Sequence, residues 1–165
     1  MKLKKTVLAA LLAALTCVAT FIIRIPSPLN GYINLGDCVV LLCGWLLGPF
    51  YGFLAAGIGS GIADLSAGYI IYAPVTFLIK GIMAVAAYYI FNLFSKSKSL
   101  IGLILSGIVA EIIMIGGYYI FEGFMYGFAG SLVNIPANAV QGIAGIACAV
   151  PLFGIIKKYI SEIFT

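Results

Sequence analysis

Three ionisable side chains lie inside long apolar runs of this sequence, and they restrict what the chain can fold into. Asp64, Lys80 and Glu111 each have mostly apolar neighbours over the length of a membrane-spanning helix. An ionisable group at membrane depth is costly unless it is paired or borders a wet cavity, and it usually marks a binding site or a transport path. We therefore expect these groups to face the interior of a helix bundle that contains a polar pocket.

The composition agrees with a membrane protein. Hydrophobic residues make up 64% of the chain and charged residues 8%, with a mean hydropathy of +1.20. A soluble domain carries about 25% charged residues. The 165 residues suit one domain, residues 1–165, with room for about six spans. The basic residues lie at the ends of apolar segments rather than in a patch, so we expect a lipid bilayer and no nucleic acid as partner.

Six apolar runs, separated by turn residues and charges, predict an all-α membrane protein with six transmembrane helices. The runs cover residues 6–23, 35–47, 50–67, 75–94, 100–121 and 131–156. The second run is short for a full span. Prolines, glycines and asparagines predict a loop over Arg24–Asn34, and we expect a turn over 66–74 and a glycine-rich loop over 122–130.

The first run has a basic start, as signal peptides do. It is longer than a usual signal-peptide core and ends at Arg24 without a clear small-residue cleavage site. We therefore interpret it as the first transmembrane helix.

The positions of the lysines predict the orientation. With six spans, only Arg24 lies near one face, and the other face carries Lys2, Lys4, Lys5, Lys96, Lys98, Lys157 and Lys158. The positive-inside rule makes the lysine-rich face and both termini cytoplasmic. The loops over 24–34, 66–72 and 122–130 then face outward, where we expect the ligand entrance.

Amide side chains form a stripe on the last predicted helix. Asn134, Asn138 and Gln141 are spaced i, i+4 and i+7, which places them on one helix face. Such amides also serve as hydrogen-bonding contacts between membrane helices. Three on one stripe that opens toward the outer leaflet favour a ligand site.

The fifth predicted helix carries a second stripe, formed by Glu111, Met114, Tyr118 and Glu122. We expect a buried ion pair in which Lys80 binds either Glu111 or Asp64, and such a pair can also border the ligand cavity. The complete set of candidate ligand-binding residues is Asn34, Asp64, Tyr72, Lys80, Glu111, Tyr118, Asn134, Asn138 and Gln141. Asn34 and Asp64 lie near the outer loops and are candidates for gate residues.

Alanines on the first predicted helix recur at four-residue spacing. The pairs are Ala9 with Ala13 and Ala10 with Ala14. Small residues at this spacing let two helix backbones approach closely, in a partner protein or within the same chain. A similar face on the third helix, built from glycine and alanine between Gly52 and Ala63, favours internal packing.

Several chemistries are excluded by what the sequence lacks. It contains no histidine, which argues against a metal site or an imidazole base, and no phosphate-binding loop of the G-x-x-x-x-G-K-[ST] type. No serine or cysteine can be paired with a base. We therefore expect no enzyme activity and no cofactor.

Three stretches resemble a known family. They are "GYINLGD" (31–37), "GPFYGFLAAGIGSGIADLSAGYIIYAPVTFLIKG" (48–81) and "NIPANAVQG" (134–142). Together with the size and the alanine-rich first helix, they resemble the substrate-binding S component of an energy-coupling factor (ECF) vitamin transporter. The resemblance implies a multi-pass protein of a prokaryotic cell membrane that joins a transmembrane coupling subunit and two cytoplasmic ATPases. It also implies that Ala9, Ala10, Ala13 and Ala14 dock the coupling subunit.

Within that family the sequence is most similar to the branch for pyridoxine, hydroxymethylpyrimidine and riboflavin. A polar heteroaromatic ring suits a pocket of amides, tyrosines and a charged group. We expect vitamin B6 or its pyrimidine relative as cargo, then riboflavin. Two alternatives remain at this stage, a solitary proton-coupled carrier that uses Glu111, Lys80 and Asp64, and a structural membrane protein without a ligand.

Overall fold

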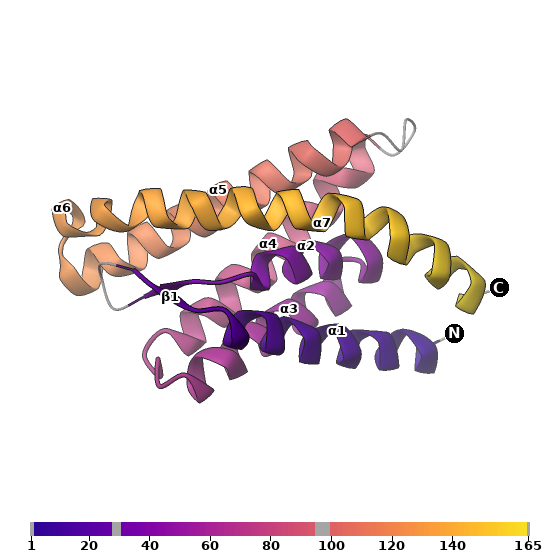
Figure 1. Cartoon of the computed structure of the whole chain (residues 1–165), viewed down its shortest axis with the longest axis horizontal. Helices are drawn as coiled ribbons and strands as arrows, with labels where there is room; N and C mark the ends of the chain where they lie inside the picture. The colour runs from indigo at the N-terminus through magenta and orange to yellow at the C-terminus, as the bar shows by residue number, and fades with distance from the viewer. Residues whose placement is uncertain (1, 28–30, 95–99, 165) are drawn as a thin grey trace.

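The computed structural model describes residues 2–27, 31–94 and 100–164, which fold into a bundle of helices (Figure 1). Six helices of 12 to 30 residues account for most of the described chain: α1 (Lys2–Ile22), α2 (Gly36–Leu47), α3 (Pro49–Ser66), α4 (Ala73–Leu93), α5 (Leu100–Tyr126) and α7 (Ile135–Phe164). A short helix, α6 (Phe128–Ser131), and one 3-10 turn, η1 (Leu132–Asn134), connect α5 to α7. Two strands, β1 (Ile25–Pro26) and β2 (Tyr32–Ile33), lie between α1 and α2.

The six apolar runs correspond to these six helices, but two predicted boundaries are wrong. The segment 122–130 is mostly helical, because α5 continues to Tyr126 and α6 begins at Phe128. Gly127, with φ +87°, supplies the break between them. The last helix continues beyond residue 156 to Phe164, because no proline follows Pro151 in the sequence and the single Gly154 does not end the helix.

The predicted loop over Arg24–Asn34 contains a small hairpin, so the fold is not purely helical. Its strands pair in antiparallel register, with Ile25 opposite Ile33 and Pro26 opposite Tyr32. Residues 28–30 lie outside the described residues, as do Lys96 and Lys98 of the lysine-rich face.

Four helical stretches of the described chain have the length and apolar composition of a membrane span. They are Leu3–Ile22, Ala73–Leu93, Leu100–Tyr126 and Phe128–Tyr159. The 12 residues of α2 reach only about 18 Å, whereas a bilayer core is about 30 Å thick. That α2 and α3 also cross the membrane, which would make six spans, therefore remains a prediction.

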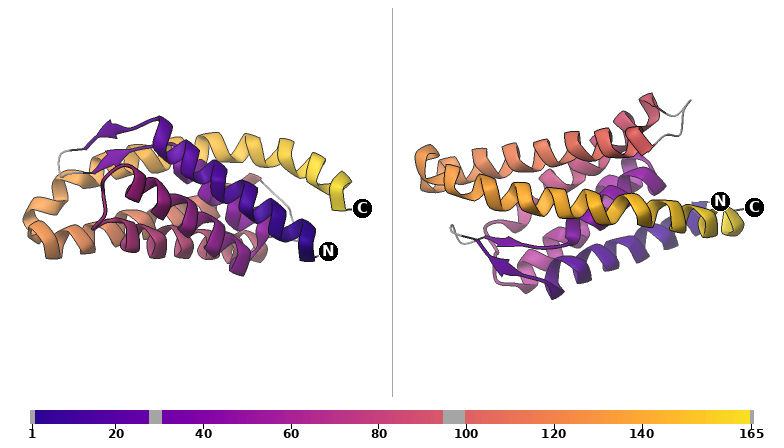
Figure 2. Two further views of the ribbon diagram at one scale, coloured as in Figure 1. Left: turned by 90° about the horizontal axis from the view of Figure 1, so that it is seen from below. Right: turned by 45° about the horizontal axis from the view of Figure 1, so that its top comes forward.

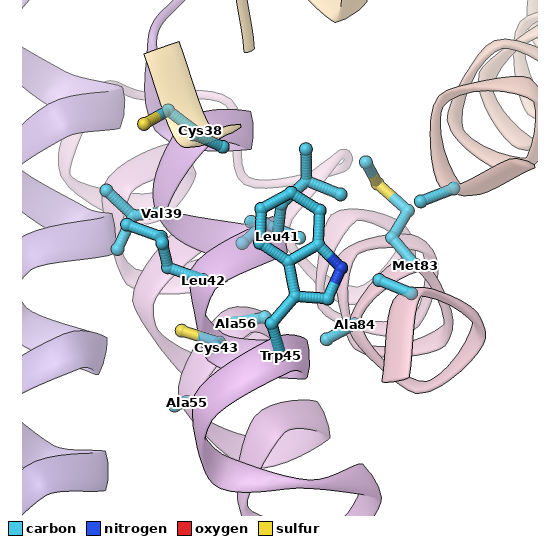
Figure 3. Close-up of a cluster of buried hydrophobic side chains, with 14 of the residues drawn as sticks. Cys38, Val39, Leu41, Leu42, Cys43, Trp45, Ala55, Ala56, Met83 and Ala84 are labelled. Carbon is cyan, nitrogen blue, oxygen red and sulfur yellow. The ribbon is translucent and has the colours of Figure 1, made fainter. Parts of the chain in front are cut away.

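The short helix α2 forms the centre of the bundle, in contact with α1, α3, α4 and α7. All its residues except Leu46 are buried. Figure 3 shows Trp45 and Leu41 of α2 beside Met83 and Ala84 of α4. The indole Nε1 of Trp45 donates a hydrogen bond of 2.9 Å to the Ser106 hydroxyl on α5. A helix enclosed in this way needs apolar side chains on every face, which is the pattern of its sequence.

Glycines allow the neighbouring helices to approach α2 and α3 closely. A Cβ atom on Gly44 would lie 2.3 Å from the carbonyl oxygen of Ala84, and one on Gly59 would lie 2.4 Å from that of Ala13. Larger residues would separate these backbones. The predicted packing face of α3 is therefore confirmed at Gly59, where it packs against α1.

Both termini lie at one end of the bundle, and the hairpin and α6 lie at the other (Figures 1 and 2). The polar residues of the predicted pocket lie toward the hairpin end.

Candidate ligand pocket

A polar pocket lies beneath the hairpin, between the ends of α3, α4, α5 and α7. It spans about 420 Å³ of empty space with its open mouth included, but only about 40 Å³ is free for the centres of water molecules. A cavity that takes one benzene ring measures about 150 Å³, so a ring can enter only when lining side chains move. The lining residues are Ser27, Gly31, Tyr32, Asn34, Asp64, Tyr69, Tyr72, Thr76, Tyr118, Glu122, Asn134, Asn138 and Gln141.

The pocket brings together seven of the nine predicted ligand-binding residues, from four different parts of the chain. These are Asn34, Asp64, Tyr72, Tyr118, Asn134, Asn138 and Gln141. The other two, Lys80 and Glu111, are buried but do not belong to the lining.

A contact between the hairpin and α3 lies at the mouth of the pocket. The phenol of Tyr32 on β2 donates a hydrogen bond of 2.5 Å to Oδ1 of Asp64. The Tyr32 ring also packs against Tyr69, with 4.9 Å between ring centroids. Burial, followed by the nearby Asp64 charge, raises the pKa of Tyr32 above its usual value, so the phenol keeps its proton. The hairpin is thus positioned as a cover held by one hydrogen bond and one ring contact.

The carboxylate of Glu122 forms part of the pocket wall and accepts hydrogen bonds from two donors. Asn134 Nδ2 donates a hydrogen bond of 2.8 Å to Oε1 of Glu122, and the Tyr72 hydroxyl donates to the same oxygen at 3.4 Å. The other oxygen, Glu122 Oε2, is buried and has no hydrogen-bond partner among the described residues. One turn away along α4 and α5, the Thr76 and Tyr118 hydroxyls lie 3.0 Å apart.

The floor of the pocket is a chain of hydrogen bonds that reaches a buried ion pair. The Asn34 backbone N–H donates to Gln141 Oε1 at 2.9 Å, and Gln141 Nε2 donates to Asp37 Oδ2 at 2.6 Å. The other carboxylate oxygen of Asp37 pairs with Lys80 Nζ. Lys80 also lies over the ring of Tyr118, 5.6 Å from its centroid. The floor thus links Asn34, which directly follows β2, with α2, α4 and α7.

The predicted partner of Lys80 was wrong. Its ammonium group binds Asp37, not Glu111 or Asp64, since Asp37 stands in the first turn of α2 and points toward α4. Asp37 is the last residue of the stretch 31–37 and is fully buried. Because it directly follows a predicted loop, the sequence pattern did not indicate this burial.

Glu111 is buried below the pocket. It is 4% exposed, and neither of its carboxyl oxygens has a hydrogen-bond partner in the part of the chain that the structure describes. It packs against the small residues of α7, where a Cβ on Gly142 would lie 3.0 Å from Glu111 Oε2 and one on Gly145 would lie 3.3 Å from Oε1. The same Cβ on Gly145 would lie 2.9 Å from Asp37. Glu111 and Asp37 therefore flank one glycine of α7.

Six lining residues were not among the predicted site residues: Ser27, Gly31, Tyr32, Tyr69, Thr76 and Glu122. The helical period places Glu122 on the stripe with Tyr118, which was a usable signal. Thr76 lies one turn before Lys80 on α4 and was another. Tyr32 and Tyr69 lie outside the helices, where helical periodicity cannot indicate which way a side chain points.

The alanines of α1 divide between two faces. Ala9 is buried and Ala13 packs against the core, while Ala10 and Ala14 are exposed. Ala13 contributes the backbone that meets Gly59. Of the four predicted docking residues, Ala9 and Ala13 therefore pack inside the bundle, and Ala10 and Ala14 face outward.

Comparisons with known proteins agree on one family. The family model for the ECF-type riboflavin transporter, S component, matches residues 1–158. An uncharacterised protein of Pyrococcus woesei is 37% identical over 148 residues, which cover 88% of this chain and 97% of that protein. The thiamine precursor transporter HmpT of Lactococcus lactis is 28% identical over 158 residues, which cover 94% of this chain and 89% of HmpT.

The fold is also similar to a solved structure, described as the S component of a bacterial ECF transporter. The TM-score is 0.67 at 23% identity, covering 100% of this chain and 99% of that one. The family is one of transporter subunits rather than enzymes. The chain therefore belongs to the S components of ECF-type transporters, which are integral membrane proteins.

Proposed function

We propose that this S component captures a small single-ring heteroaromatic vitamin or vitamin precursor, pyridoxine or hydroxymethylpyrimidine. The observation that carries the proposal is the pocket itself, which combines amide side chains with tyrosines and carboxylates at one end of the bundle. Such groups match the ring nitrogens, hydroxyls and aromatic faces of a heterocycle. A mismatched ligand would leave buried polar groups unpaired, which gives selectivity.

The small free space of the pocket supports a single-ring cargo, because a larger ring system requires more side chains to move. Similarity to the thiamine precursor transporter supports the pyrimidine. Riboflavin is the second candidate, supported by the description of the matching family model.

The lysine distribution supports an outward-facing pocket. The termini lie at the end of the bundle opposite the hairpin (Figure 1), and the positive-inside rule places that end in the cytoplasm of a prokaryotic cell. Cargo then enters from outside, beneath the hairpin. Asp64 and Tyr32 form the gate, and their hydrogen bond breaks when the hairpin lifts.

Delivery into the cell requires partners that hydrolyse ATP. We propose that a transmembrane coupling subunit and two cytoplasmic ATPase subunits supply this step, as the family implies. The exposed Ala10 and Ala14 on α1 form the docking stripe, because a stripe of small residues lets a partner helix approach closely.

A solitary proton-coupled carrier is the competing function, and the geometry gives it little support. Such a carrier needs proton steps between Glu111, Lys80 and Asp64. Lys80 is held by Asp37 and Asp64 accepts from Tyr32, so no hydrogen bond among the described residues joins the three groups. The family membership also favours a subunit of a larger transporter.

Transport assays in proteoliposomes separate the two functions. We expect uptake of labelled cargo only when the coupling subunit, both ATPases and ATP are present. The carrier hypothesis predicts uptake by this chain alone, driven by a pH gradient and abolished by an uncoupler. Uptake under those conditions would overturn the proposed function.

A further inference from the structure

One oxygen of the pocket wall has no donor, and it belongs to a residue that is almost completely buried. Glu122 is 2% exposed, and its Oε2 has no hydrogen-bond partner in the described part of the chain. Its Oε1, in contrast, accepts from Asn134 at 2.8 Å. A buried acceptor left unpaired is destabilising, because it has lost its hydrogen bonds to water without replacing them. A donor on the cargo would remove that cost.

The charges around the pocket favour the same kind of cargo. Asp64 and Glu122 both line it, whereas none of the described lining residues is Lys or Arg. The nearest lysine in the network, Lys80, is bound to Asp37 outside the lining. An anionic cargo would meet two carboxylates without a compensating cation, while a cargo that donates N–H groups or carries positive charge is attracted.

A second polar group in the pocket is available to the same ligand. Asn138 is half-buried, lines the pocket and makes no side-chain hydrogen bond within the described residues. A primary amide offers both a donor and an acceptor. It can therefore bind a ring nitrogen or a hydroxyl group, whichever the cargo presents.

We propose that Glu122 is a specificity-determining residue that accepts a hydrogen bond from an N–H group of the cargo. The substrate class is thus a heteroaromatic ring with an amino group or a protonated ring nitrogen, and compounds bearing phosphate or carboxylate are rejected. This inference rests on the proposed function, since it assigns the cargo of the same pocket.

The substitution Glu122→Gln tests the hydrogen bond with little change of shape. Asn134 Nδ2 donates to Oε1, so it holds the carbonyl oxygen of the glutamine at that position. The new NH2 group then takes the position of Oε2. An unpaired acceptor on a residue that lines the pocket is replaced by a donor, which repels an amino group on the cargo.

The probes are 4-amino-2-methyl-5-hydroxymethylpyrimidine and the same ring with hydrogen in place of the amino group, titrated by calorimetry into the full chain in detergent. The wild type should bind the amino compound about 10- to 100-fold more tightly than the analogue. Glu122→Gln should remove that preference and leave the affinity for the analogue nearly unchanged. Glu111→Gln, the same change on the same helix but outside the lining, should keep the preference.

Three results would overturn the inference. One is equal binding of the two probes by the wild type, and another is an equal loss for both probes in Glu122→Gln protein that melts like the wild type. The third is tight binding of pyridoxine that does not depend on Glu122, which leaves the proposed function standing. If the wild type binds none of these compounds, the proposed function fails together with the inference.

Discussion

Lys80 on α4 and Asp37 on α2 form an ion pair in the interior of the bundle, with side chains 4% and 0% exposed. Gln141 of α7 donates to the second oxygen of Asp37. Three helices therefore meet at one carboxylate, directly below the pocket. Each of the two charges has the other as its partner in place of water, because the bilayer could not solvate them.

Removal of one member of this pair should destabilise the protein strongly. Lys80→Met leaves the Asp37 carboxylate buried without its cation, at a cost of about 3–5 kcal/mol. We expect a clear fall in the melting temperature, measured by circular dichroism in detergent. The double variant Lys80→Met, Asp37→Asn should recover most of it, because it leaves no unpaired charge. If the single variant melts like the wild type, the pair is not a structural element of the bundle.

The hairpin should control how long the cargo stays bound. Tyr32→Phe removes the hydrogen bond to Asp64 and keeps the ring contact with Tyr69. We expect the dissociation rate of the cargo to rise about tenfold, because a hydrogen bond to a charged group stabilises the closed hairpin by a corresponding free energy. The association rate should change little. Stopped-flow displacement of bound cargo measures both rates. Tyr159→Phe, an exposed position on α7, is the matched control.

The raised pKa of Tyr32 adds a pH criterion to the same measurement. A phenol whose pKa lies above 10 in the folded protein stays protonated at all lower pH values. The wild-type dissociation rate should therefore not increase between pH 7 and pH 9 through loss of this donor. An increase that disappears in Tyr32→Phe would contradict the assigned hydrogen bond.

Asn138→Ala should weaken cargo binding by about tenfold, because it removes an amide that faces the pocket. The fold should be unaffected, since Asn138 holds no other described residue. Asn92→Ala removes an exposed amide at the other end of the bundle, where Asn92 bonds only the Tyr88 carbonyl. Calorimetric titration compares the two. Equal affinities in both variants would remove Asn138 from the site.

The two alanine faces of α1 should respond differently to a large residue. Ala14→Trp adds bulk on the exposed face, so we expect normal cargo binding, loss of transport and no recovery of the coupling subunit in a pull-down. Ala13→Trp places the same bulk against Gly59 and should instead lower the melting temperature. Retained assembly of Ala14→Trp with its partners would disprove the docking stripe.

Much of the fold could be predicted from the sequence, because apolar runs in a membrane protein map directly onto helices. Helical periodicity also placed Asn134 and Gln141 on the pocket side of the bundle. Periodicity does not report depth or partners, so it could not tell that α2 is enclosed or that Lys80 binds Asp37. Those features depend on how the helices pack. Close backbone contacts at glycines such as Gly44 determine that packing.

The pocket mouth was the least predictable part of the site. Tyr32 and Tyr69 come from segments between helices, and their positions follow from the hairpin register and from tertiary contacts. Glu122 was assigned to a stripe, but the predicted loop over 122–130 obscured that its helix continues to Tyr126. The hydrogen bond from Asn134 is what fixes its role, and no sequence pattern contains it.

The most direct test of the account is to identify what the protein binds. Small molecules released by denaturing the detergent-purified chain should be analysed by mass spectrometry, and each candidate vitamin then titrated by calorimetry. The account predicts a stoichiometric single-ring heterocycle with an N–H donor, bound tightly by the wild type and weakly by Glu122→Gln. A protein that carries no small molecule and responds to no vitamin would contradict it.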